Sequence, residues 1–157
     1  LMHVIASKAV AFGEALKPEF AEYAAQVVRN SKHLAHYFME RGVSLVTNGT
    51  DNHLMLIDCM SSWNMPGGEV EHLLDEIGIT LNKNMIANDT RKPMDPSGVR
   101  LGTPAVTTRG MKEKDMETLA DFMLKAIEVR SDPSAIQSLR KEVIAFCRAF
   151  PVPGIPS

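Results

Sequence analysis

The sequence lacks the features that mark several large classes of protein. Its only two cysteines, Cys59 and Cys147, are far apart and in no CxxC pair, which excludes a disulfide framework and a cysteine zinc site and is typical of a reducing cytosol. The formal net charge of −2 offers no broad basic surface to nucleic acid or to an anionic membrane. No run approaches the roughly 20 apolar residues that span a bilayer. We therefore expect a cytoplasmic protein with no nucleic-acid or membrane partner.

Familiar catalytic motifs are missing as well. The five histidines form no HExxH pattern, and no cysteine or carboxylate stands at metal-ligand spacing. His33 and His36 are three residues apart in a predicted helix, which a solvated pair explains. There is no GxSxG, GxGxxG or P-loop, and Gly67-Gly68 before a predicted helix is only a weak indication of an anion site. Any chemistry must come from another group of residues.

What the chain does have is the pattern of a small mixed domain. The hydrophobic fraction is 45% and the charged fraction 23%, which are ordinary values for a globular protein. Hydrophobic periodicity, glycines and prolines predict helices over 4–16, from Pro18 to a stop at Gly42, and over 69–77, 111–129 and 133–148. Alternation predicts strands over 43–47, 53–58, 79–82 and 98–101. This order predicts a two-layer α+β fold, with a small, mainly antiparallel sheet and helices on one face.

The first predicted helix is unusual because it is apolar on nearly every side. Such a helix is buried all round or packs on a partner. The chain opens on Leu1-Met2-His3, with no initiator methionine at position 1 and no capping residue ahead of the helix. We therefore expect this chain to be part of a longer polypeptide.

The most informative run is Ser97-Gly98-Val99-Arg100-Leu101-Gly102-Thr103-Pro104. It places one arginine between two glycines at the end of a predicted strand. Thr103 and Pro104 predict the N-cap and first position of a following helix. The planar guanidinium of Arg100 can make two parallel hydrogen bonds to a carboxylate. The alternative is an ion pair with a structural acid of the same chain.

Two further polar clusters are candidates for a site. Asn82-Lys83-Asn84 ends a predicted strand and opens a polar loop over 83–96, and loops of this length in compact domains are often functional. With Arg100 this cluster could line one side of a cleft, although asparagines also satisfy backbone groups in turns. Thr50-Asp51-Asn52-His53 is explained equally by a capped hairpin turn or by a site.

These residues carry a resemblance that covers almost the whole chain. It resembles the C-terminal part of serine hydroxymethyltransferases. Several short segments match, in the order in which they occur in the family. They are Leu1-Met2-His3-Val4-Ile5-Ala6, Lys8-Ala9-Val10-Ala11-Phe12, Glu14-Ala15-Leu16-Lys17-Pro18-Glu19-Phe20, Gly49-Thr50-Asp51-Asn52-His53-Leu54, Gly78-Ile79-Thr80, Asn82-Lys83-Asn84, Asn88-Asp89, and Ser97 to Ala105 with Thr107-Thr108-Arg109-Gly110.

The resemblance implies a pyridoxal-phosphate enzyme of the aspartate-aminotransferase-like fold, fold-type I. The family interconverts serine and glycine and transfers a one-carbon unit to tetrahydrofolate. Arg100 occupies the position of the arginine that binds the amino-acid carboxylate, and Asn84 that of an asparagine that contacts the folate pterin ring. Residues 1–16 would be a connecting helix from the large domain, and 17–157 the C-terminal small domain. A homodimer or tetramer is implied for the intact enzyme.

The resemblance also implies what this chain does not contain. In the family, the Schiff-base lysine and the residues that contact the cofactor ring lie upstream of the region that matches, and no lysine here stands in such a motif. We expect the chain alone to bind no pyridoxal phosphate and to be inactive. Arg91-Lys92-Pro93-Met94-Asp95-Pro96 also replaces the Phe-Val-Thr-like run usual before Ser-Gly, which affects the expected folate side of the site.

Two alternatives remain open from the sequence. The first is the small domain of another fold-type I enzyme, such as an aminotransferase, which also has a carboxylate-binding arginine. The second is an α+β binding module without catalysis.

Overall fold

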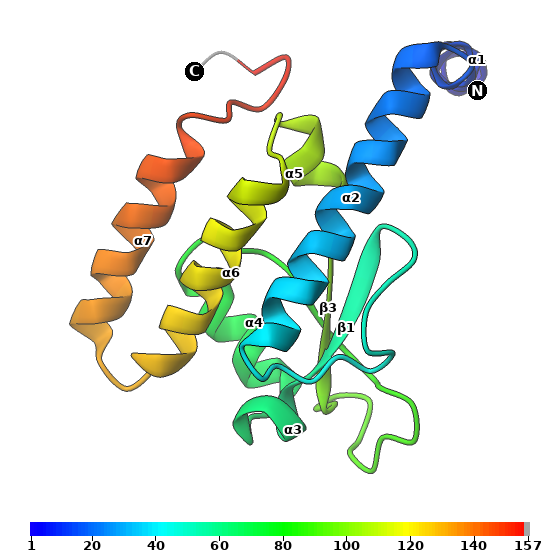
Figure 1. The fold of residues 1–157 in the computed structure, drawn as a ribbon. Helices are drawn as coiled ribbons and strands as arrows, with labels where there is room; N and C mark the ends of the chain where they lie inside the picture. The colour runs from blue at the N-terminus through cyan, green and yellow to red at the C-terminus, as the bar shows by residue number, and fades with distance from the viewer. Residues whose placement is uncertain (156–157) are drawn as a thin grey trace.

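The computed structural model describes residues 1–155; residues 156 and 157 of the predicted small domain lie outside the described residues. Helices make up most of the structure, with a few short strands between them (Figure 1). In chain order the elements are α1 Met2–Ala15, α2 Pro18–Glu40, β1 Leu54–Asp58, α3 Cys59–Trp63, α4 Gly67–Glu76, β2 Asn82–Asn84, β3 Gly98–Gly102, α5 Pro104–Thr108, α6 Glu113–Glu128 and α7 Pro133–Cys147.

The sheet has three strands in the order β1-β3-β2, and both pairings are antiparallel. Alternation along the strands places Met55, Ile57 and Val99 on one face, where all three are buried. In Figure 1 the helices α2, α6 and α7 lie side by side in that order, with strands β1 and β3 behind and beside α2. This helix-rich arrangement on a small antiparallel sheet is compatible with the predicted α+β class.

The core forms where the helices meet the buried face of the sheet. The spacing of residues by threes and fours predicts an inward stripe on α2 that runs from Phe20 to Phe38, and its members Val27, Ser31, Leu34, Ala35 and Phe38 are all buried. The first member, Phe20, is instead 45% exposed. Phe20 is in the first turn of α2. In Figure 1 this end of α2, which joins α1, extends beyond the sheet. The largest fully buried side chains include Phe38, Ile57, Leu74, Ile77, Met111, Met116 and Leu139.

Three elements differ from the predictions. The predicted strand 43–47 is reduced to one antiparallel bridge between Leu45 and Ile57, because the chain turns at Asn48, which has a φ of 51°. The predicted strand 79–82 is displaced to Asn82–Asn84, since the Ile79 amide still donates to the Leu74 carbonyl at the end of α4. The short helix α3, Cys59–Trp63, was not predicted.

Thr103 has a different role from the predicted N-cap side chain. It stands at the N-cap position of α5 and Pro104 is the first helical residue, as predicted, but the threonine side chain makes no capping hydrogen bond. Instead, its buried Oγ1 donates to the Val27 carbonyl of α2 at 2.8 Å. The end of β3 is therefore tied to the longest helix of the molecule.

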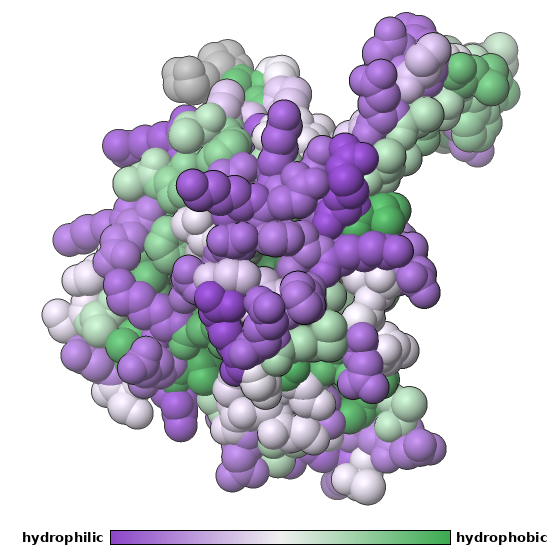
Figure 2. Space-filling model, in the orientation of Figure 1, coloured by the Kyte–Doolittle hydropathy of each residue, from purple (hydrophilic) through white to green (hydrophobic). Residues whose placement is uncertain are grey.

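The helix α1 extends away from the rest of the chain. None of its residues is buried, and no side chain caps its first turn, in line with the uncapped start that the sequence predicts. Figure 2 shows apolar atoms along this projecting helix. No helix within residues 1–155 combines the length and the hydropathy needed to cross a membrane. The exposed large apolar residues in and beside α1 are Leu1, Met2, Val4, Ile5, Val10, Phe12, Leu16 and Phe20.

We predict that this chain self-associates through α1, because exposed apolar surface of this extent favours association. Replacing Val10 and Phe12 together by glutamate should shift the chain toward monomer in sedimentation velocity over a concentration series. Glutamate is a good helix former, so the helix itself is preserved. The Ile144→Glu variant, which alters an exposed apolar residue of α7, is the matched control and should associate like the wild type. A monomeric wild type at high concentration would refute the prediction.

Candidate functional site

Arg100 lies in the middle of the sheet, on the face that is turned away from the core. Its strand neighbour Val99 is fully buried, so alternation directs Arg100 to the opposite face, where it is exposed. The register places Leu56 of β1 on one side of Arg100 and Asn82 of β2 on the other. Asn84 lies two residues along β2, on the same face as Asn82. We call this surface, formed by Leu56, Asn82, Asn84 and Arg100, the open face.

A shallow pocket of about 390 Å³ surrounds Arg100. It brings the arginine together with Asn82 and with His53, the residue directly before β1, which the sequence analysis placed in a different cluster. Asn84 does not line this pocket, and Thr80 lines it without having been singled out. The lining residues are His53, Leu54, Thr80, Leu81, Asn82, Arg100, Leu101 and Gly102.

The guanidinium of Arg100 has no partner among residues 1–155. It makes neither an ion pair nor a side-chain hydrogen bond with any residue of the described range 1–155. Arg109 shows the contrasting case, because its Nε donates to the Phe150 carbonyl at 2.7 Å and its Nη2 to the Cys147 carbonyl at 3.0 Å. The interpretation of Arg100 as the partner of a structural acid is therefore wrong for residues 1–155. Its donors are available to an external anion.

The glycines around Arg100 are required by close backbone contacts. A Cβ at Gly98 would lie 2.8 Å from the Ile57 carbonyl oxygen, and a Cβ at Gly102 would lie 2.7 Å from the His53 carbonyl oxygen. Both oxygens belong to the β1 side of the sheet, so side chains at these positions would push β3 away from β1. The motif therefore fixes the backbone of β3 at both ends and leaves Arg100 as its exposed, unpaired residue.

The loop between β2 and β3 is held by Asp89. Its Oδ1 accepts from Ser97 Oγ at 2.7 Å and from the Arg91 amide at 2.9 Å, and its Oδ2 accepts from the Ser97 amide at 2.9 Å and the Ile86 amide at 3.3 Å. Desolvation raises the pKa of this carboxyl, but the hydrogen bonds from Ser97, Arg91 and Ile86 outweigh it and lower the pKa to about 2. The ionised carboxylate is therefore a structural centre of the loop.

The rest of the loop, where the sequence departs from the family pattern, has contacts of its own. Arg91 Nε donates to the Asp95 carbonyl at 3.0 Å, and the two side chains form an ion pair. The carbonyl of the buried Pro96 accepts from the Gly67 amide at 2.8 Å, at the start of α4. Met94 is 80% exposed at the tip. Residues 91–96 therefore form a loop with its own internal contacts, and its last residue is hydrogen-bonded to the start of α4.

The two asparagines of β2 are only partly used within the chain. Asn82 Nδ2 donates to the Lys83 carbonyl at 3.1 Å, and Asn84 Nδ2 donates to the Met85 carbonyl at 2.6 Å. Neither side-chain carbonyl accepts a hydrogen bond from a residue of 1–155. Lys83 pairs with Val99 and therefore faces the opposite side of the sheet, and its amide donates to Glu71 Oε1 at 3.1 Å. The predicted cluster is thus split, with Lys83 separated from Asn82, Asn84 and Arg100.

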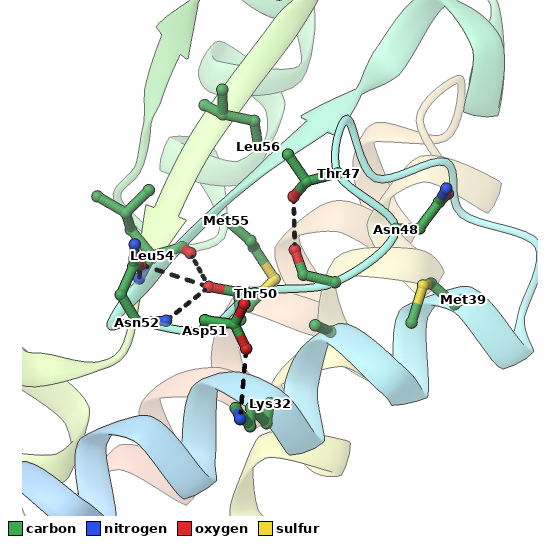
Figure 3. Close-up of a pocket in the computed structure, with 12 residues that line it drawn as sticks. Lys32, Met39, Thr47, Asn48, Thr50, Asp51, Asn52, Leu54, Met55 and Leu56 are labelled. Atoms are coloured by element: carbon green, nitrogen blue, oxygen red, sulfur yellow. Dashed lines mark hydrogen bonds and ion pairs between the residues drawn. The ribbon is translucent and has the colours of Figure 1, made fainter.

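The second cluster forms a turn beside a larger pocket of about 560 Å³ between α2 and β1 (Figure 3). Thr50 Oγ1 donates to the Leu54 carbonyl at 2.6 Å and accepts from the Asn52 amide at 3.2 Å. Asn52 Oδ1 accepts from the Leu54 amide at 2.9 Å. Asp51 forms an exposed ion pair with Lys32 at 3.5 Å. These contacts favour the turn interpretation, because the polar side chains are occupied by the turn itself.

Other candidate chemistry is weak in the described residues. Burial and the charge of Asp58 raise the pKa of the Cys59 thiol to about 12, so this thiol is protonated at neutral pH and is a poor nucleophile. Within residues 1–155, no three or more histidine, cysteine, aspartate or glutamate side chains are grouped as metal ligands would be. The open face with Arg100 remains the best candidate site.

A comparison with models of known protein families supports the resemblance seen in the sequence. The family model described as serine hydroxymethyltransferase matches residues 1–123 of the 157-residue chain. The matched range begins before α1, ends within α6, and includes the whole sheet with Asn84, Asp89 and Arg100.

The Asp89 contacts predict an unusual titration. Because the folded-state pKa of about 2 lies below the ordinary value of 3.8, the carboxylate stabilises the fold above about pH 4, and this contribution is lost as the pH falls through the folded pKa. Carbon NMR of the Asp89 carboxyl should give a midpoint near 2 in the wild type and a higher midpoint in Ser97→Ala. The control Ser138→Ala, which removes a hydroxyl bonded to Ser134 in α7, should leave it unchanged. A wild-type midpoint near 3.8 would contradict the structure.

Proposed function

Because the chain belongs to the serine hydroxymethyltransferase family, we propose that it is the C-terminal small domain of a fold-type I, pyridoxal-phosphate-dependent hydroxymethyltransferase, in which Arg100 binds the carboxylate of serine or glycine. The intact enzyme would interconvert these amino acids and transfer a one-carbon unit to tetrahydrofolate, as a cytoplasmic homodimer or tetramer. The observation that carries the proposal is the exposed guanidinium of Arg100 on the open face, which has no partner within residues 1–155.

The surroundings of Arg100 suit a carboxylate ligand. The planar fork can make two charge-assisted hydrogen bonds to one carboxylate, and the flanking glycines hold the backbone that carries it. No acid competes for the guanidinium in residues 1–155. A hydrogen bond to a charged group contributes about 1.5–3 kcal/mol, and holding the substrate in one orientation lowers the barrier further.

The residues present do not form a site for pyridoxal phosphate by themselves. Lys83 follows Asn82 directly, but its strand position faces the core side, opposite Arg100. No lysine lines the pocket around Arg100. In our proposal the cofactor, which would supply the electron sink of the reaction, and its Schiff-base lysine come from outside residues 1–157. The chain alone would then bind the cofactor poorly and be inactive.

Asn84 is proposed to contact the folate. Its Oδ1 is available as an acceptor, and it shares the open face with Arg100, so a folate bound at β2 would lie beside an amino acid bound at β3. An aminotransferase small domain would also need a carboxylate-binding arginine, but the family match does not favour it.

The Arg100→Ala variant of the intact enzyme should lose about 100-fold in serine affinity, because two charge-assisted hydrogen bonds are removed. The absorbance of bound pyridoxal phosphate should stay unchanged, since Arg100 is not expected to hold the cofactor. Arg148→Ala, which removes an exposed arginine of the C-terminal region with no side-chain partner in residues 1–155, is the matched control and should bind serine normally. Retained serine affinity in Arg100→Ala would place the carboxylate site elsewhere.

The Asn84→Ala variant should weaken tetrahydrofolate binding about tenfold while serine affinity stays near the wild-type value, because only contacts to the folate are lost. Isothermal titration of the intact enzyme with each ligand separates the two effects. Gln137→Ala, which removes an exposed side-chain amide of α7, is the control and should retain folate affinity. Unchanged folate affinity in Asn84→Ala would remove this assignment.

A further inference from the structure

The connection between β2 and β3 does not set the register of these strands through its turn geometry. A short hairpin turn fixes register, but here residues 85–97 separate the two strands. The strand β2 is only three residues long and lies at the edge of the sheet, so its ladder alone holds it weakly. Yet β2 and β3 carry Asn84 and Arg100. Some other contact must hold these residues in register.

The carboxylate of Asp89 supplies that contact. It accepts from the Ile86 amide, two residues after β2, at 3.3 Å, and from both the amide and the hydroxyl of Ser97, the residue before β3, at 2.9 and 2.7 Å. The Arg91 amide adds a fourth bond at 2.9 Å. One side chain therefore joins the end of β2 to the start of β3.

Ser97 extends this link to the third strand. Its carbonyl accepts from the Cys59 amide at 3.0 Å and from the Met60 amide at 3.3 Å, directly after β1 ends at Asp58. Ser97 is buried, so these bonds are shielded from solvent. The hydrogen bonds of Ser97 therefore connect all three strands directly before β3, the strand that carries Arg100.

We propose that Asp89 is a positioning residue for substrate binding, which holds β2 and β3 in register through Ile86 and Ser97 and so places Arg100 and Asn84 on one surface. This inference rests on the proposed function of Arg100. Asp89 does not line the pocket around Arg100, so in this proposal it acts through the strands that it joins.

The chemistry of the contact requires a carboxylate. Four donors converge on Asp89, and an ionised carboxylate accepts at both oxygens. An asparagine would turn an NH₂ group toward some of these donors and leave them unsatisfied. Asp95, on the same loop, offers a matched comparison, because within residues 1–155 its exposed carboxylate pairs only with the Arg91 side chain. Exposed ion pairs contribute little to stability.

The test compares two ligands of the intact enzyme, serine and 2-aminoethanol, which is serine without its carboxylate. Asp89→Asn should weaken serine binding about tenfold and leave 2-aminoethanol binding and the cofactor absorbance unchanged, because only the placement of the carboxylate-binding arginine is disturbed. Adding Asp89→Asn to Arg100→Ala should cause no further loss of serine affinity, since both act through one contact. Asp95→Asn should bind serine like the wild type.

Several results would overturn the inference. These are unchanged serine affinity in Asp89→Asn, an equal loss for both ligands, or an additive loss in the double variant. If Asp89→Asn does not fold, the Ser97→Ala variant removes a single hydrogen bond to Asp89. This variant should lose less serine affinity and should also keep its affinity for 2-aminoethanol. Wild-type serine affinity in Ser97→Ala would also overturn the inference. Retained serine affinity in Arg100→Ala would instead refute the proposed function, so the two failures are distinguishable.

Discussion

The close packing of the β3 backbone between β1 and β2 is the constraint on which the candidate site depends. Gly98 and Gly102 have no room for a Cβ against the carbonyl oxygens of the β1 side, and Thr103 continues the link into α2. A strand held at both ends leaves its middle residue no freedom of backbone position. Arg100 is that residue. Its backbone is held in place, whereas its guanidinium has no partner within residues 1–155.

The two faces of the sheet differ in burial and in composition. On one face Ile57 and Val99 are fully buried beneath the helices and supply the hydrophobic stabilisation. The other face holds Arg100 with two asparagines that still have an acceptor available. Because Arg100 has no partner within residues 1–155, no contact of the fold explains its place in the motif, and we propose that a ligand does. This division, together with the family match, supports the proposal that the open face binds an amino acid.

Sequence patterns predicted the parts of the structure that local chemistry determines. The helix α7 begins at Pro133 because Asp132 caps it, a signal contained within a few residues. The predicted strand 43–47 failed because the turn at Asn48 interrupts it. The position of Arg100 on a strand was predictable, but its lack of an acid partner depends on distant elements. The role of Asp89 was missed for the same reason, since Ser97 lies eight residues away.

The most direct measurement is a crystal structure of the intact enzyme with glycine bound. The account predicts that both carboxylate oxygens of glycine lie within about 2.7–2.9 Å of the Arg100 guanidinium nitrogens, in a bidentate pair. It also predicts that the β2–β3 register seen here is retained, with Asn82 opposite Arg100. A structure in which another residue binds the glycine carboxylate, while Arg100 pairs with an acidic side chain of the enzyme, would contradict the account.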